Sequence, residues 1–273
     1  MMNSDASVQA VQITKPMNHP AVEVANVVKT YRVGHTDYPA LRGVSFKIEK
    51  GELASIIGPS GSGKSTVLNL IGALDRPTSG KVFVDGINLR KLDEDRLAIL
   101  RNRKIGFIYQ SFNLIQRLTA VENVEMPLIS RGTPEKIRRA KAAYMLKMVG
   151  LGNKLNKKPN ELSGGEQQRV AVARALIAEP AIVIGDEPTG NLDSKTTREI
   201  LNLIVRMNKE KGLTFIIVTH NMEVAEMTHK IISIRDGLVE KEQILHKLDS
   251  FTNEPKIASP PMPVQPQTRT PIL

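Results

Sequence analysis

Cysteine and tryptophan are absent from this chain of 273 residues, and aromatic residues make up only 4% of it. The lack of cysteine excludes disulfides and thiolate metal sites, and it is compatible with a reducing cytoplasm. No window approaches the roughly 18 uncharged apolar residues that a membrane span needs, and residues 1–20 lack the basic start and apolar stretch of a signal peptide. We therefore expect a chain that by itself is soluble and not secreted.

The charge is unevenly spread. The formal net charge is +10, and most of the surplus lies in residues 131–158, where Glu135 is the only acid. One interpretation is an anionic membrane surface or nucleic acid nearby. The other is the solvent-exposed face of a helix, because apolar residues at helical spacing in 134–149 also predict a buried stripe on the same helix. The basic residues are Arg131, Lys136, Arg138, Arg139, Lys141, Lys147, Lys154, Lys157 and Lys158, and the stripe is Ile137, Ala140, Tyr144, Met145 and Met148.

The ends of the chain differ in composition from its centre. Hydrophobic residues make up 41% of the chain, enough to bury a core, and we place one folded domain at 21–249. Residues 1–20 are expected to form a flexible tail. Residues 250–273 hold six prolines and few large apolar residues, which predicts an extended, disordered tail.

Strand-like runs alternate with helical patterns along the centre. Strands are expected at 21–28, 43–48, 53–57, 81–84, 105–109, 181–185, 214–218 and 231–234, and helices at 64–73, 94–103, 134–149, 166–178 and 195–210. Three of the strand runs are apolar throughout, as in parallel strands buried on both faces. The pattern predicts an α/β core with antiparallel strands at its start and an all-helical subdomain inserted at about 112–160.

A glycine-rich loop follows the strand at 53–57. Its residues are Gly58, Pro59, Ser60, Gly61, Ser62, Gly63, Lys64 and Ser65. They fit the phosphate-loop template, in which backbone N–H groups surround a triphosphate, Lys64 charges the β and γ oxygens and Ser65 reaches Mg²⁺. The helix that opens at Lys64 adds its dipole and free N–H groups. We expect Mg-ATP or Mg-GTP as ligand, and a P-loop NTPase fold with a RecA-like parallel core.

Polar residues end three other buried strands. Asp186 and Glu187 follow an apolar strand, where Asp186 can hold Mg²⁺ and Glu187 can orient a water as general base. His220 ends the strand at 214–218 and can hydrogen-bond a γ-phosphate. Gln110 ends the strand at 105–109, and its amide can touch Mg²⁺ or the attacking water.

A second glycine turn, Ser163-Gly164-Gly165, precedes a helix and offers another anion-binding N-terminus. The chain has only one phosphate loop, and one active site does not need two such cradles. We infer that this turn closes on nucleotide held by another copy, so that two ATP molecules lie in a head-to-tail homodimer.

These motifs resemble those of the ATP-binding-cassette (ABC) ATPases, over essentially all of 21–240. The resemblance makes Gln110 the Q-loop residue, residues 162–168 (LSGGEQQ) the signature, Asn191-Leu192-Asp193 the D-loop and His220 the switch histidine. It also implies that Tyr31 stacks on adenine, although a strand-end tyrosine is the alternative. The same analogy implies that Thr66 contacts the α-phosphate and that Asp193 lies at the nucleotide site.

Within this family the runs at 106–114, 118–124 and 188–193 resemble the LolD, MacB and FtsE branch. Members of that branch work with permeases. We therefore expect an ATPase subunit that pairs with an integral membrane permease resembling MacB or FtsX and reaches the membrane surface through it, on the cytoplasmic inner face. Gly185, before the aspartate, departs from the family pattern but removes no catalytic group.

Two other functions are alternatives for a chain with a phosphate loop. A soluble ABC ATPase acting on nucleic acid or ribosomes would usually carry tandem cassettes, coiled-coil arms or zinc cysteines, and none is found here. We expect no specific nucleic acid partner. A GTPase switch protein is disfavoured by the signature at 162–168 and by the lack of an Asn-Lys-x-Asp motif.

Overall fold

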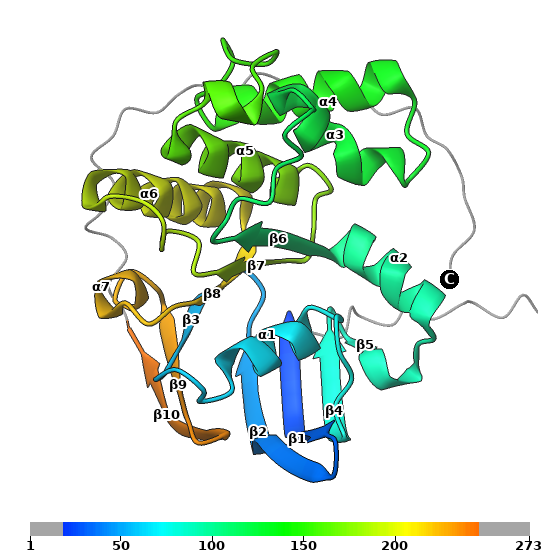
Figure 1. Ribbon diagram of the computed structural model, residues 1–273, viewed down its shortest axis with the longest axis vertical. Coiled ribbons are helices and arrows are strands. Elements are labelled where there is room, and N and C mark those ends of the chain that lie inside the picture. The colour runs from blue at the N-terminus through cyan, green and yellow to red at the C-terminus, as the bar shows by residue number, and fades with distance from the viewer. Residues whose placement is uncertain (1–18, 246–273) are drawn as a thin grey trace, which may run out of the picture.

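The structure is a computed structural model that describes residues 19–245. Apart from His19 and Pro20, the two tails expected at 1–20 and 250–273 lie outside the described residues. Within them, one sheet of six strands and one of four form the frame that helices cover (Figure 1). The predicted α/β class is confirmed.

The six-stranded sheet carries the ends of the motifs. Its order is β10-β9-β3-β8-β7-β6, and every neighbouring pair is parallel except β9 and β10. The strands are β3 (Leu53–Ile57), β6 (Ile105–Tyr109), β7 (Ile182–Asp186), β8 (Thr214–Val218), β9 (Lys230–Arg235) and β10 (Leu238–Ile244). Because β8 lies between β3 and β7, the phosphate-loop strand and the carboxylate strand end at the same edge, one strand apart.

The four-stranded sheet is antiparallel, in the order β2-β1-β4-β5, with β1 (Val22–Val33), β2 (Thr36–Ile48), β4 (Ser79–Val84) and β5 (Ile87–Asn88). The second strand begins seven residues earlier than expected, at Thr36 rather than 43. Strands β5 and β10 were not predicted. β10 is exposed along nearly its whole length, so it has no apolar alternation for a sequence to reveal.

Helices cover the six-stranded sheet and fill the segment after β6. They are α1 (Lys64–Ile71), α2 (Glu94–Lys104), α3 (Ala120–Ile129), α4 (Glu135–Met148), α5 (Gly164–Leu176), α6 (Ser194–Lys211) and α7 (Met222–Ala225), with short 3-10 turns η1 (Leu89–Lys91) and η2 (Pro159–Glu161). Between β6 and α5 the chain forms helices and loops without a strand. In Figure 1, α3, α4 and α5 lie together beyond the sheet.

The six-stranded sheet separates two hydrophobic cores, because alternate residues of each strand face opposite sides. Val183 and Phe215 pack with α5 and α6, whereas Ile184 and Ile216 pack with α1 and the antiparallel sheet. Helices α1 and α5 therefore cover opposite faces of the sheet.

The stripe expected on α4 is confirmed for Met145 and Met148, which pack against the core, but not for its other residues. The buried residues are Ala142 and Leu146, while Ala140 is exposed. Ile137, Tyr144, Met145 and Met148 are only partly buried. The face of α4 that packs on α3 and α5 is rotated relative to the expected stripe. Weakly apolar residues occur all around this helix, so its sequence does not single out one buried face, and the contacts with α3 and α5 decide which residues are buried.

Five cations of the basic segment are paired with carboxylates that come from outside it. The pairs are Arg138–Glu125 at 3.2 Å, Arg139–Glu122 at 3.3 Å, Lys141–Glu179 at 3.4 Å, Lys154–Glu166 at 2.5 Å and Lys157–Glu161 at 2.8 Å. The local charge is therefore lower than the sequence of residues 131–158 indicates, and much of the segment serves to join helices.

An ion cluster joins the antiparallel sheet to α2. The Asp85 carboxylate lies 2.7 Å from Lys104 Nζ and 2.9 Å from Lys50 Nζ. Burial alone would raise the pKa of Asp85, but the hydrogen bonds from Lys104 and Lys50 outweigh it, so this pKa lies below its ordinary value. A lowered pKa means that the cluster stabilises the fold above the unfolded pKa of about 3.9 and loses this effect as pH falls through the folded value.

We expect Asp85→Asn to lower the free energy of unfolding by about 1–3 kcal/mol at pH 7, because two ammonium groups lose their counter-charge. The difference from the parent should shrink as the pH falls below about 4. Urea unfolding followed by far-ultraviolet circular dichroism measures both. Asp236→Asn is the matched control, because Asp236 also precedes a turn glycine with positive φ but is exposed and unpaired in the described structure. An equal loss in both variants would contradict the prediction.

Candidate nucleotide site

The loop between β3 and α1 has a backbone that only glycine can adopt at two positions. Gly58 has φ +154°, and a Cβ there would lie 2.1 Å from the carbonyl oxygen of Ile234. Gly63 has φ +107°, and a Cβ would lie 2.8 Å from the carbonyl oxygen of Ala40. Because glycine carries no side chain, these two positions leave the backbone uncovered at the start of α1, where it forms a cradle.

The first turn of α1 has no side-chain cap, because its N-cap residue is Gly63. The Lys64 ammonium donates to the carbonyl oxygens of Gly58 and Pro59, both at 2.8 Å, which holds it over the loop. Ser62 Oγ is buried and has no hydrogen-bond partner in the described structure. Uncapped helix N–H groups, a fixed ammonium and an orphaned hydroxyl together fit a phosphate group.

Tyr31, on β1 of the antiparallel sheet, lies beside the start of α1. Its hydroxyl donates to Asp75 Oδ2 at 2.8 Å, and the Lys29 ammonium lies 4.7 Å from the centre of its ring and 2.6 Å from Asp75. Burial and the hydrogen bond to Asp75 raise the pKa of Tyr31, while a bond with Thr66 opposes the shift. Tyr31 and Thr66 are thus neighbours, and the ring is anchored at its hydroxyl and on one face.

Asp186 ends β7 and Glu187 follows it, at the same edge of the sheet as the phosphate loop. Glu187 Oε1 lies 2.6 Å from His220 Nδ1 and accepts from the backbone N–H of His220 at 3.2 Å. Glu187 has φ +46°, a strained value for a non-glycine residue. Burial first, and then the charge of Glu187, raise the pKa of Asp186, while the charge of Lys64 lowers it. The electrostatic effect of Lys64 on Asp186 links the loop and the carboxylate strand in one site.

Gln110 lies beside this edge, because β6 pairs with β7 so that Tyr109 is opposite Asp186. Its amide Nε2 donates to Asn191 Oδ1 at 3.2 Å, and Asn191 Nδ2 donates to the Gln110 carbonyl at 3.1 Å. The predicted Q-loop and D-loop residues are therefore in direct contact.

The second glycine turn is not part of this cluster. Ser163 caps α5, and a Cβ on Gly164 or Gly165 would meet Leu192 at 3.4 Å or Thr196 at 2.4 Å. No hydrogen bond or ion pair of the described residues joins Ser163, Gly164 or Gly165 to the loop at 58–65. Asp193 caps α6 by accepting from the backbone and hydroxyl of Thr196.

Sequence reasoning missed the residues that support the site. Lys29 and Asp75 hold Tyr31, and Thr219 Oγ1 donates to Glu187 Oε2 at 3.4 Å. Asp75 is 44 residues from Tyr31 in sequence, and no motif links them. Packing explains the glycine at position 185, since a Cβ there would lie 3.1 Å from the ring of Pro188.

The donors present fit magnesium. Asp186, Ser65 and Gln110 offer carboxylate, hydroxyl and amide oxygens, the hard ligands that Mg²⁺ prefers. Residues 19–245 contain no group of three or more His, Asp or Glu that could hold a metal ion by themselves.

The site combines a glycine loop before a helix with carboxylates at the end of a strand two positions away in a parallel arrangement. This combination defines a P-loop nucleotide-binding protein. The ABC transporter family model matches residues 41–190, and the chain belongs to this family. Among the described residues, none of the helices has the length and apolar character that crossing a bilayer requires.

Two similar proteins carry the names of transport systems. The lipoprotein-releasing system ATP-binding protein LolD of Aquifex aeolicus is 50% identical over 74% of this chain and 90% of its own. The macrolide export ATP-binding/permease protein MacB of Syntrophobacter fumaroxidans is 49% identical over 81% of this chain but only 31% of its own length. The expected resemblance to LolD and MacB is confirmed.

A solved structure shows a similar protein in a post-hydrolysis state. The cassette MJ0796, as a dimer in a post-hydrolysis state bound to ADP and phosphate, has 49% identity, a TM-score of 0.76, and matches 83% of this chain and 100% of its own. MJ0796 comes from Methanocaldococcus jannaschii. The present chain is an ABC ATPase that binds adenine nucleotide.

Proposed function

We propose that this chain is the ATP-hydrolysing subunit of a membrane transport complex, and that it pairs head to tail with a second copy around two ATP molecules. The observation that carries the proposal is the position of α5. This helix covers the face of the sheet opposite α1, and no hydrogen bond or ion pair among residues 19–245 joins its first turn to the phosphate loop of the same chain. A second copy, related by a twofold axis, can present that turn to the nucleotide. The dimeric structures of MJ0796 support this arrangement.

Each side chain has a role in the proposal. The phosphate loop from Gly58 to Ser65 binds the triphosphate, with Lys64 on the β and γ oxygens. Tyr31 offers the free face of its ring to adenine, and Thr66 lies next to the α-phosphate. Asp193 belongs to the D-loop that faces the second copy.

Glu187 is proposed as the general base that orients the attacking water. His220, which holds Glu187 Oε1, keeps the carboxylate directed to the open edge of the sheet and hydrogen-bonds the γ-phosphate. Ser65, Asp186 and Gln110 would hold Mg²⁺, which when bound neutralises charge on the phosphate oxygens.

The partner is proposed to be an integral membrane permease of the kind that works with LolD or forms part of MacB. A groove beside the edge strand β6 is lined by residues of β6, α2, α3 and α5, among them Phe107 and the exposed side chains of Leu74 and Met126. Two guanidinium groups, Arg101 and Arg174, line it and bind only backbone carbonyls among the described residues. We propose that a permease helix with an acidic side chain binds here, which places the ATPase on the inner face of the membrane.

Purification of a tagged Glu187→Gln variant from native membranes with ATP tests this proposal. Mass spectrometry should identify an integral membrane protein. Recovery of ribosomal or DNA-bound proteins alone would overturn the transport assignment.

In the same experiment we expect Met126→Glu to reduce permease recovery at least about tenfold, because a carboxylate would be desolvated in an apolar contact. Ile244→Glu is the matched control, since Ile244 is an exposed apolar residue on β10, at the opposite edge of the sheet. Equal recovery with both variants would place the permease elsewhere. The unfolding midpoint of each variant excludes a folding defect.

A further inference from the structure

The signature helix α5 begins with a reciprocal cap. Ser163 Oγ accepts from the backbone N–H of Glu166 at 3.3 Å, and Glu166 Oε2 accepts from the backbone N–H of Ser163 at 3.0 Å. The Ser163 side chain also hydrogen-bonds the Glu166 carboxylate, so Glu166 holds both the backbone and the hydroxyl of Ser163. The position of the Ser163 hydroxyl therefore depends on how firmly Glu166 is held.

The other oxygen of Glu166 is held by a lysine from the preceding loop. Lys154 Nζ lies 2.5 Å from Glu166 Oε1, and both side chains are partly buried. The hydrogen bonds from Lys154 and from the Ser163 backbone lower the pKa of Glu166. Two donors therefore use two oxygens, an arrangement that a carboxylate can satisfy and a single carbonyl oxygen cannot.

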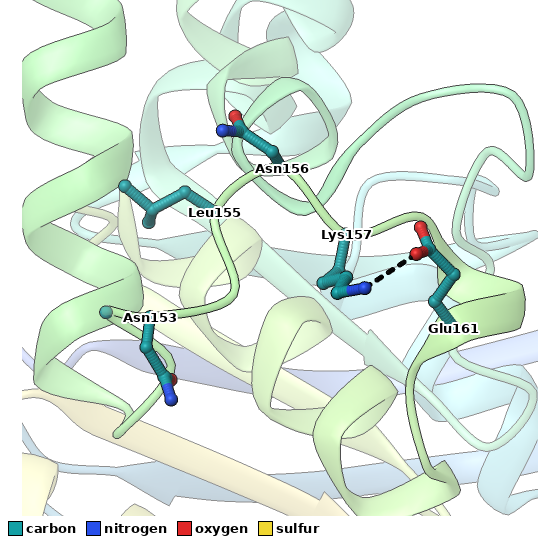
Figure 2. Close-up of a pocket in the computed structure, with 6 residues that line it drawn as sticks. Asn153, Leu155, Asn156, Lys157 and Glu161 are labelled. Atoms are coloured by element: carbon teal, nitrogen blue, oxygen red, sulfur yellow. Dashed lines mark hydrogen bonds and ion pairs between the residues drawn. The ribbon is translucent and has the colours of Figure 1, made fainter.

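The backbone of the loop next to Lys154 is held by hydrogen bonds with α3. The carbonyl oxygens of Leu155 and Lys157 accept from the first N–H groups of α3, Val121 at 3.0 Å and Ala120 at 2.7 Å. Figure 2 shows this loop, with Asn153, Leu155 and Asn156 following it toward the turn at Glu161. Because the loop is bonded to α3 at Leu155 and at Lys157, little chain entropy is lost when Lys154 binds Glu166.

We propose that Lys154 is a positioning residue for ATP-driven dimer closure, acting through Glu166 to fix the Ser163 hydroxyl at the start of α5. The inference rests on the proposed function, in which Ser163 meets the nucleotide of the second copy. Lys154 touches neither nucleotide nor reacting atoms in this role. Its loss frees the Glu166 carboxylate to rotate and loosens the cap, so the signature turn presents a less ordered donor to the γ-phosphate.

The same loop contains a natural control. Lys157 pairs with Glu161 at 2.8 Å, and Glu161 also accepts from a backbone N–H, that of Lys158 at 2.8 Å (Figure 2). This pair resembles Lys154 and Glu166 in its bonding, but its glutamate lies on η2 and both of its side chains are more exposed. It ends one residue before Leu162 and supports no group of the signature turn.

The test uses the Glu187→Gln background, in which the ATP-bound dimer should accumulate, and compares Lys154→Met, Lys154→Arg and Lys157→Met. ATP-dependent dimerisation is measured by size-exclusion chromatography with light scattering, and ATP affinity of the monomer by titration with a fluorescent analogue. We expect Lys154→Met to weaken dimerisation about tenfold to a hundredfold, since each dimer contains the signature turn twice. Monomer affinity should be unchanged, Lys154→Arg should restore dimerisation, and Lys157→Met should match the parent.

Dimerisation of Lys154→Met at the strength of the parent would overturn the inference alone, and so would an equal defect in Lys157→Met. A Glu187→Gln protein that stays monomeric at saturating ATP would instead overturn the proposed dimer and the inference with it. Glu166→Gln gives a second measurement if Lys154→Met folds poorly. It should weaken dimerisation to the same extent, and combining it with Lys154→Met should add little, because both changes break one linkage. Additive effects would contradict the inference.

Discussion

Glu187→Gln should reduce kcat for ATP hydrolysis by about 10²–10⁴-fold, the usual contribution of a positioned general base. The amide retains the size of the carboxylate and an oxygen for the bond with His220 Nδ1, so the edge of β7 keeps its shape. ATP affinity should stay within about threefold, because the glutamate does not bind the triphosphate in the proposed site. Steady-state hydrolysis assays and equilibrium ATP titration measure the two effects separately.

Glu223→Gln is the matched control. Glu223 is exposed in the first turn of α7, three residues beyond His220, and its side chain contacts no proposed catalytic group. Its activity should equal that of the parent. A Glu187→Gln protein that hydrolyses ATP at the parental rate would require another base, and Asp186, whose pKa is raised by burial and by the charge of Glu187, would be the first residue to test.

Lys64→Ala has the second large expected effect, a loss of ATP affinity of about a hundredfold or more, because charge-assisted hydrogen bonds to phosphate are among the strongest in proteins. The ammonium also bonds the carbonyls of Gly58 and Pro59, so its removal leaves part of the loop unsupported. Titration with a fluorescent ATP analogue measures the affinity, and the unfolding midpoint separates binding from stability.

Lys91→Ala controls for the loss of one positive charge, since Lys91 is exposed at the end of η1 and forms no ion pair among the described residues. Its ATP affinity should be unchanged. Comparable weakening in both variants would mean that general electrostatic attraction, rather than the loop lysine, provides the binding energy.

Two parts of the site could be read from the sequence because each is local. The phosphate loop depends on glycines whose backbone angles are set within eight consecutive residues, and the helix N-terminus follows directly in the chain. Asp186 and Glu187 come at the end of an apolar run long enough to mark a buried parallel strand. The carboxyl ends of parallel strands share an edge, so these two motifs had to lie near one another.

Where the sequence was misleading, the signal was weak or shared. The apolar residues of α4 are spread around the helix, and only the packing of α3 and α5 decided that Ala142 and Leu146 face the core. The basic segment 131–158 looked like an unbalanced charge, yet its partners include Glu125 and Glu179, which lie outside it.

The sequence by itself determined the class of this protein: the loop at 58–65, the strand before Asp186 and the signature at 162–168 define an ABC ATPase through short contiguous patterns. Tertiary structure alone decided which groups meet: Tyr31 with Asp75, Glu187 with His220, Gln110 with Asn191 and Lys154 with Glu166. The physical reason is that backbone angles and helix starts depend on neighbouring residues, whereas side-chain pairs across a fold depend on strand order, register and the face on which each helix packs.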